Sequence, residues 1–252
     1  MICHGSRTLP DAGLSPTRSA LGIGGRGQAR RMPVVESLAC ASRQHELAEA
    51  LGRGMRHKHR GDFEAAAQAF SIAAHGGNAV AQYQLACLHL HGRGVAPDAA
   101  EAVSWLERSA AQGYVNALAC LGALCKKDYG SVPANPSKAA DLLAAAAAKG
   151  HAIAQYHLAD MYARGHGIVQ DYAQALNLFQ RSAELGCGPA QYCLGLLYAD
   201  GLGVCRDCKN ATHWLQKAAD QGCAPAAAAL NRLLHRDGAP PWHMPSTAAA
   251  QV

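Results

Sequence analysis

The residues best placed to do chemistry are two cysteines separated by two residues, Cys205 and Cys208. Two thiolates at this spacing can bind Zn²⁺ or form a redox pair. His213 follows five residues later, and Cys187 and Cys193 lie in the same segment. A structural zinc site usually needs a second pair with its own clear spacing, and the sequence holds no second Cys-x-x-Cys. Incidental thiols are therefore the favoured interpretation, with a metal-linked or redox-sensitive module as the alternative.

The thirteen histidines give no catalytic pattern, because they are scattered along the chain. No Ser, His and acidic residue recur in the arrangement of a triad, and no glycine loop of the phosphate-binding type appears. His89 occupies the place that Tyr162 and Tyr198 hold later in the chain, which favours a packing role. The sequence therefore predicts no enzyme and no cofactor.

These residues lie in a chain that repeats about every 36 residues. Glycines spaced by 36, 37, 36 and 36 residues end equivalent segments: Gly77, Gly113, Gly150, Gly186 and Gly222. Alanines with the same four spacings form an independent series: Ala81, Ala117, Ala154, Ala190 and Ala226. Two series with the same single insertion establish an internal repeat, which decides the fold class.

Each full repeat has the pattern of a helix, a turn and a second helix. Apolar residues at i, i+4 and i+7, such as Ala154, Leu158 and Met161, mark one face of the first helix. Glycine pairs at the turn allow the positive φ that stops this helix: Gly92 and Gly94, Gly165 and Gly167, Gly201 and Gly203. N-cap residues are expected to begin the second helices: Asp62, Asp98, Asn135, Asp171 and Asp207. Four residues after each cap comes an alanine, and four further on a large apolar residue.

The pattern closely resembles the Sel-1-like repeat, a relative of the tetratricopeptide repeat. The segments that carry the resemblance are AQYHLADMYARGHGIVQDYAQALNLFQRSAELG (154–186) and AQYCLGLLYADGLGVCRDCKNATHWLQKAADQG (190–222). The repeat after Gly113 departs from the pattern, since its turn, CKKDYGSVPANP, keeps only Gly130. The resemblance implies an all-α, right-handed α/α solenoid of about five helix pairs, with residues 223–236 as a capping helix. It also implies a non-catalytic scaffold or adaptor that binds a protein or peptide partner on its concave face.

In this class of solenoid the first helices line the concave face, so residues there are candidates for partner binding. Three tyrosines recur two residues after the marker alanines, and three variable residues follow them: Tyr83, Gln84, Tyr156, His157, Tyr192 and Cys193. The tyrosines are either anchors for a bound peptide or packing residues between helices. A basic run near the first repeat adds Arg56, Lys58 and Arg60, as a dock for an acidic segment or as a solvated helix end.

Charge and hydropathy limit the other classes of function. Residues 1–60 carry ten Lys and Arg against four Asp and Glu, whereas the remaining chain is almost neutral, at thirteen against fourteen. A neutral repeat body argues against nucleic acid as the partner, because a basic face is needed to neutralise phosphates. No apolar stretch has the length of a signal peptide or a membrane span. We expect a cytoplasmic protein, with a secreted, host-interacting repeat protein as an alternative.

The expected domain organisation has three parts. Residues 1–40 form an N-terminal segment that is disordered or precedes the true start at Met32, residues 41–236 form the repeat domain, and residues 237–252 form a disordered tail.

Overall fold

The computed structural model describes residues 34–235, together with the side chains of residues 41–234. The expectations for residues 1–33, for Met32 as the start and for residues 237–252 lie outside the described residues. The contacts divide the chain into two units, residues 1–41 and 42–252. The first unit contributes only the beginning of one helix to the described residues, and the second unit contains the repeats.

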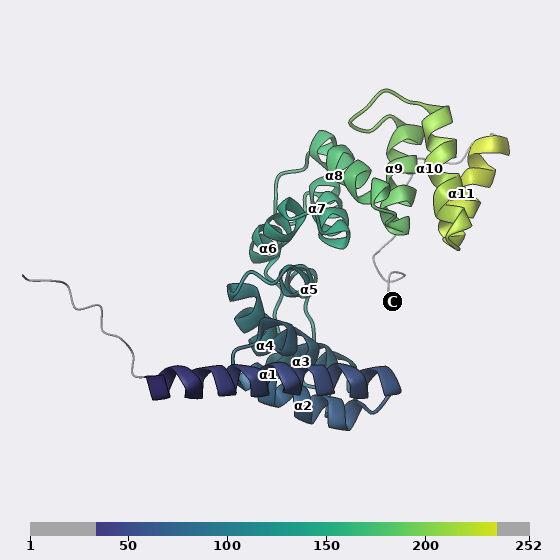
Figure 1. Cartoon of the computed structure of the whole chain (residues 1–252). Coiled ribbons are helices and arrows are strands. Elements are labelled where there is room, and N and C mark those ends of the chain that lie inside the picture. The colour runs from purple at the N-terminus through teal and green to yellow at the C-terminus, as the bar shows by residue number, and fades with distance from the viewer. Residues whose placement is uncertain (1–33, 236–252) are drawn as a thin grey trace, which may run out of the picture. The chain divides into compact units, whose positions relative to one another are not determined.

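The described residues form eleven α-helices and no strand (Figure 1). The helices are α1 (Val34–Arg60), α2 (Phe63–His75), α3 (Ala79–His91), α4 (Ala99–Ala111), α5 (Val115–Cys125), α6 (Pro136–Ala148), α7 (Ala152–Arg164), α8 (Tyr172–Glu184), α9 (Gly188–Asp200), α10 (Cys208–Asp220) and α11 (Ala224–His235). Five pairs followed by a single helix confirm the all-α repeat fold that the sequence predicts. α1 begins at Val34, inside the segment that the sequence assigns to residues 1–40.

The second helix of each pair begins at a residue whose side chain accepts a hydrogen bond from the first turn. These N-cap residues are Asp62, Asp98, Asn135, Asp171 and Asp207. In three pairs the first helix ends at a left-handed glycine: Gly92, Gly165 and Gly201. The second glycine of each turn, Gly94, Gly167 or Gly203, also has a positive φ, from 69° to 76°. The local chemistry thus ends one helix and begins the next in every full repeat.

The turn glycines also let the main chain approach the preceding repeat. At Gly94, a Cβ atom would lie 2.2 Å from the carbonyl carbon of Phe63 at the start of α2. Gly167 and Gly203 meet Pro136 and Tyr172 in the same way. A side chain at these positions would push adjacent repeats apart, so glycine is required by packing as well as by conformation.

The core is built from the small and large residues that keep register along the chain. Every marker alanine of the first helices is fully buried: Ala81, Ala117, Ala154, Ala190 and Ala226. The second helices bury an alanine and, four residues later, a large residue: Ala66 and Phe70, Ala102 and Leu106, Ala139 and Leu143, Ala175 and Phe179, Ala211 and Leu215. Because the small residue lets helices approach closely, each large residue can fill the space between them.

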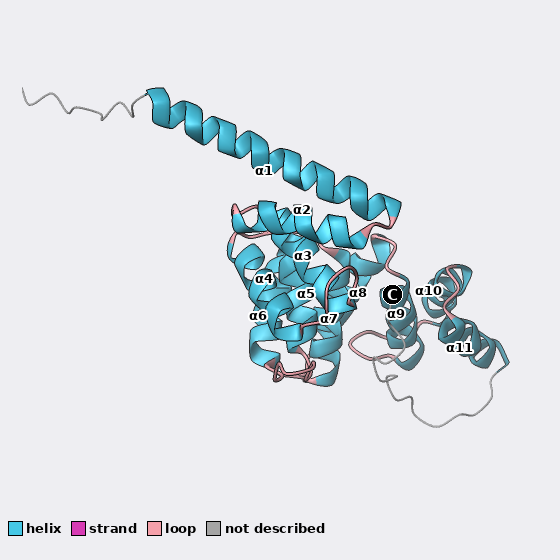
Figure 2. Cartoon of the chain, turned by 90° about the horizontal axis from the view of Figure 1, so that it is seen from below, coloured by secondary structure: helices cyan, strands magenta, loops and turns pink. Residues whose placement is uncertain are grey.

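From α2 to α11, successive helices pack on each other, as Figures 1 and 2 show for the second unit. Direct contacts between first helices, such as α5 with α7 and α9 with α11, join successive pairs. This is nearest-neighbour packing, in which each repeat is stabilised by the ones beside it. Within residues 34–235, none of the helices is long and apolar enough to cross a membrane.

Candidate functional site

The first helices of successive pairs are linked by side chains on one face. Nζ of Lys58, in the last turn of α1, donates a hydrogen bond of 2.7 Å to Oε1 of Gln84 on α3. The ring of Tyr83 packs edge-on against Tyr114, the N-cap residue of α5, with the centroids 5.4 Å apart. Tyr83 and Gln84, two of the residues predicted from the sequence to bind a partner, are therefore half-buried and make these contacts between the first helices.

An ion cluster continues the link from α5 to α7. Nζ of Lys126, the C-cap residue of α5, lies 2.8 Å from Oδ2 of Asp160 on α7, and Nε of Arg164 binds Oδ1 of the same carboxylate. The side chains of Lys126 and Asp160 are only 10% and 5% exposed. Burial alone raises the pKa of Asp160, but the two cations outweigh it and hold the pKa below its usual value. We call the surface that these contacts form, from Lys58 on α1 to Arg164 on α7, the first-helix face.

The cluster carries one more positive than negative charge, because two cations share a single carboxylate. Replacing Asp160 would leave the buried ammonium of Lys126 without a compensating charge, so this carboxylate is the residue that holds α5 and α7 together in the cluster.

His157 lies one turn before Asp160 on α7. Its Nδ1 atom is buried and has no hydrogen-bond partner among the described residues. Burial, together with the charge of Lys126, lowers the pKa of His157 to about 4. The imidazole is therefore neutral at physiological pH, where it adds a half-buried polar group but no charge to the first-helix face.

The other first-helix residues proposed from the sequence are not accessible. Tyr156, Tyr192 and Cys193 are buried and belong to the hydrophobic core. Burial raises the pKa of the Tyr156 hydroxyl and of the Cys193 thiol. Tyr156 packs on Phe179 of the following second helix, with centroids 6.0 Å apart. Of the two alternatives for the tyrosines, the observed burial favours packing between helices.

The basic run lies in the last turns of α1. Arg56 and Arg60 are exposed, whereas Lys58 is half-buried and is held by Gln84. The last turns of α1 thus carry two exposed cations besides the one that Gln84 holds.

The cysteines form no cluster of metal ligands in the described part of the chain. Cys205 and Cys208 are exposed free thiols, with Cys208 as the first residue of α10. No group of three or more His, Cys, Asp or Glu residues within residues 41–234 is arranged to hold a metal ion. Burial raises the pKa of the Cys87 thiol, and that of Cys120 to about 12, so these thiols are poor nucleophiles at neutral pH. No described feature favours the metal-linked or redox alternative.

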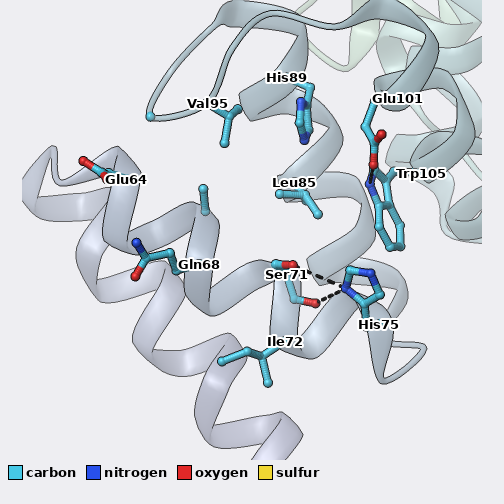
Figure 3. Close-up of a pocket in the computed structure, with 12 residues that line it drawn as sticks. Glu64, Gln68, Ser71, Ile72, His75, Leu85, His89, Val95, Glu101 and Trp105 are labelled. Atoms are coloured by element: carbon cyan, nitrogen blue, oxygen red, sulfur yellow. Dashed lines mark hydrogen bonds between the residues drawn. The ribbon is translucent and has the colours of Figure 1, made fainter.

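A groove on the opposite side of α3 involves the second helices. It lies between α2 and α4, has a volume of 580 Å³ and is floored by Leu85 and His89 of α3 (Figure 3). Glu64 on α2 and Glu101 on α4 contribute carboxylates, and Ile72 and Trp105 are among the apolar residues of the wall. Neither the groove nor the ion cluster was predicted from the sequence. The sequence does contain one sign of the ion cluster. Lys126 stands where another repeat has Leu90, and Asp160 stands where another has Leu196, so both charges replace apolar residues.

The sequence was compared with protein-family models. The model described as the Sel1 repeat matches residues 79–114, 117–151, 152–187 and 188–223, which is more than half of the chain. The match includes the repeat with the irregular turn between α5 and α6, whereas α1, α2 and α11 lie outside it. A search of curated proteins found no match.

Solved structures of repeat proteins resemble this chain over most of its length. A protective antigen of uropathogenic Escherichia coli strains, which displays an SLR fold, is 31% identical, with a TM-score of 0.68 over 77% of this chain and 42% of its own. A Sel1 repeat protein from Oxalobacter formigenes is 34% identical, with a TM-score of 0.60 over 68% of this chain and 49% of its own. A putative Sel1 repeat protein from Klebsiella pneumoniae, at 22% identity and a TM-score of 0.50, shares the fold over 77% of this chain and 96% of its own.

The chain thus spans less than half of the length of the first two of these proteins. The four matched repeats, together with the helix pairs and turn glycines described above, show that this protein belongs to the Sel1 repeat family, whose members commonly act as protein-interaction scaffolds.

Proposed function

We propose that this protein is a non-catalytic scaffold that binds an extended or helical segment of a partner protein along the first-helix face. The observation that carries the proposal is the series of side-chain contacts that joins α1, α3, α5 and α7 into one fixed surface. A surface fixed before binding loses little conformational entropy when a partner segment is received.

The polar side chains beside these contacts, rather than the buried tyrosines, give the surface its specificity. Gln84 and His157 are half-buried, and Arg60 and Lys127 are exposed. An exposed polar residue can discriminate between partners without disturbing the core, whereas a substitution at Tyr156 would first disturb the packing on α8.

The proposal is tested with a triple variant of the first-helix face. Arg60→Glu, Gln84→Arg and Lys127→Glu change the charge and shape of this surface without removing a buried residue. The variant and the native chain are used to capture partners from the native cell lysate at two salt concentrations. We expect the partner that the native chain retains at high salt to be lost by the variant.

A matched variant controls for the change in net charge. Gln174→Arg, Arg181→Glu and Lys209→Glu introduce the same charges at exposed positions of α8 and α10. This variant should keep the partner. Loss of the partner from both variants, or retention by both, would show that recognition does not depend on the first-helix face.

A further inference from the structure

The groove between α2 and α4 is a second candidate binding site, on residues that the first-helix face does not use. Figure 3 shows Glu64 and Gln68 of α2 on one side, Glu101 and Trp105 of α4 on the other, and Leu85 and His89 between them, while His75 of α2 lies beside Trp105. Val95, in the turn that follows α3, also lines the groove. The site has a volume of 580 Å³, which is large enough for one long side chain and the main chain beside it.

The groove owes its space to a departure from the repeat pattern. His89 takes the place of Tyr162 and Tyr198, which are half-buried and pack against the core in the later repeats. The shorter imidazole leaves room that a phenol ring would fill. In the equivalent place of the next pair, a 2.7 Å ion pair between Glu107 of α4 and Lys138 of α6 crosses between the second helices. Glu101, at the position equivalent to Lys138, has no such cation opposite it among the groove-lining residues.

His89 also has a local energetic cost. Its Nδ1 atom is buried without a hydrogen-bond partner among the described residues. An unsatisfied buried polar atom destabilises the fold, so packing alone does not explain a histidine here. The residue is better explained by the space that it leaves in the groove.

The charge of the groove defines its ligand. The carboxylates of Glu64 and Glu101 line it, and no Lys or Arg is among the described residues that do so. Oε1 of Glu101 accepts a 2.9 Å hydrogen bond from Nε1 of Trp105, which fixes the carboxylate beside the indole. Arg108 lies over the Trp105 ring, 4.6 Å from its centroid, but does not line the groove. The rest of the lining combines apolar side chains, among them Ile72, Leu85 and Trp105, with the uncharged polar groups of Gln68 and Ser71 and the imidazoles of His75 and His89.

We propose that this groove receives an arginine or lysine side chain from a partner segment. The aliphatic stem of such a side chain packs beside Leu85 and Trp105, and its charged end pairs with the carboxylate of Glu101, while Glu64, on the opposite side of the groove, adds to the negative potential. The carboxylates would repel an acidic ligand. A purely apolar ligand would remove water from them without offering a hydrogen bond or a charge in return.

The test uses blocked arginine amide as the probe and blocked norleucine amide as its uncharged counterpart. Binding is followed by NMR through the indole N–H resonance of Trp105. Trp214 is an internal control, because it holds the same position on α10, with Lys217 over its ring as Arg108 is over Trp105. We expect arginine amide to shift the Trp105 resonance saturably and to leave that of Trp214 unchanged, with norleucine amide binding at least tenfold more weakly.

Three variants separate the charge of the groove from its shape. Glu64→Gln and Glu101→Gln should each lower the affinity for arginine amide by about two- to fivefold, which is the effect expected for losing a partly exposed ion pair. The amide oxygen that Glu101→Gln introduces can still accept from Trp105, so this variant keeps the local hydrogen bond. His89→Tyr should abolish binding by filling the groove, and Glu184→Gln, on α8, should change nothing.

The proposal is overturned if both amides bind equally, if Trp105 and Trp214 respond alike or if neither responds. Unchanged affinity in His89→Tyr, at an intact circular dichroism spectrum, overturns it as well. These outcomes are independent of the first-helix face, because none of the three variants lies on it.

Discussion

A buried glutamine recurs at the residue after the marker alanine, and one copy lacks a partner that the others have. Gln82, Gln155 and Gln191 each donate from Nε2 to a main-chain carbonyl of the preceding second helix, at 3.1 to 3.2 Å. Oε1 of Gln82 accepts from Gln112 at 2.8 Å, and Oε1 of Gln191 accepts from Gln221 at 2.9 Å. These two donors are the C-cap residues of α4 and α10.

The C-cap residue of α8 is Leu185, which cannot donate from its side chain. Oε1 of Gln155 consequently has no partner among the described residues, although Gln155 is 1% exposed. Leu185 itself is 59% exposed, so its side chain contributes little to the core. Leu185→Gln should therefore satisfy a buried acceptor at almost no cost in packing.

We expect Leu185→Gln to raise the free energy of unfolding by about 1 kcal/mol, the typical net value of one hydrogen bond in a protein. For an array of this size, the melting temperature should rise by about 2 to 4 °C. The measurement is urea unfolding at pH 7 followed by circular dichroism. Because the effect requires Gln155, the same change in a Gln155→Met background should give no increase.

Leu185→Ser controls for the removal of an exposed leucine, and it should leave the stability within about 0.5 kcal/mol of the native value. The reasoning is refuted if Leu185→Gln gives no gain, or if its gain is the same when Gln155 has been replaced. The new hydrogen bond predicts a coupling energy of about 1 kcal/mol between positions 155 and 185, whereas two independent substitutions would give none.

Three further substitutions test the ion cluster, the turn and the buried imidazole. Asp160→Asn leaves its buried ammonium partner uncompensated and should lower the free energy of unfolding in urea by about 3 kcal/mol. Gly94→Ala places a Cβ atom against the main chain of α2 and should cost more, in a thermal melt, than Gly61→Ala, which has a similar φ of 80° but open space around it. The pKa of His157 is lowered to about 4 from an unfolded value of about 6.5, so the unfolded state takes up the proton first and stability falls as the pH drops through this range. Between pH 7 and pH 5 the loss attributable to His157 should be about 2 kcal/mol, and unfolding curves of His157→Asn should lack this part of the pH dependence.

The repeat could be predicted from the sequence because its determinants are local and recur at fixed spacing. A cap at Asp171 or a turn at Gly165 depends on the residues within one helix turn. The marker alanines, such as Ala154, are buried in every pair, so the same packing is encoded five times. Agreement among five copies outweighs one irregular turn, which is why the family match extends through the repeat that keeps only Gly130.

The first-helix face and the groove could not be predicted in the same way, because they depend on contacts between repeats. Lys126 and Asp160 are 34 residues apart and occupy different positions within their repeats. The period of one repeat identifies the face that packs within a helix pair, but not the face that meets the next pair. For this reason the sequence placed Tyr156 and Tyr192 on the first helices but left open whether they anchor a peptide or pack between helices, and their burial favours packing.

Residues that break the repeat pattern divide into two physical kinds. Leu185 breaks it at an exposed position, leaves a buried acceptor unsatisfied and forms no groove, so restoring glutamine should stabilise the array without affecting binding. His89 also leaves a buried nitrogen unsatisfied, but it creates space beside two carboxylates. Tyrosine at this position should remove the unsatisfied nitrogen, and because its ring fills the groove it should also abolish the binding of arginine amide. A position where stability and binding change in opposite directions is one that packing alone does not explain, and this comparison distinguishes a functional departure from a neutral one within a single chain.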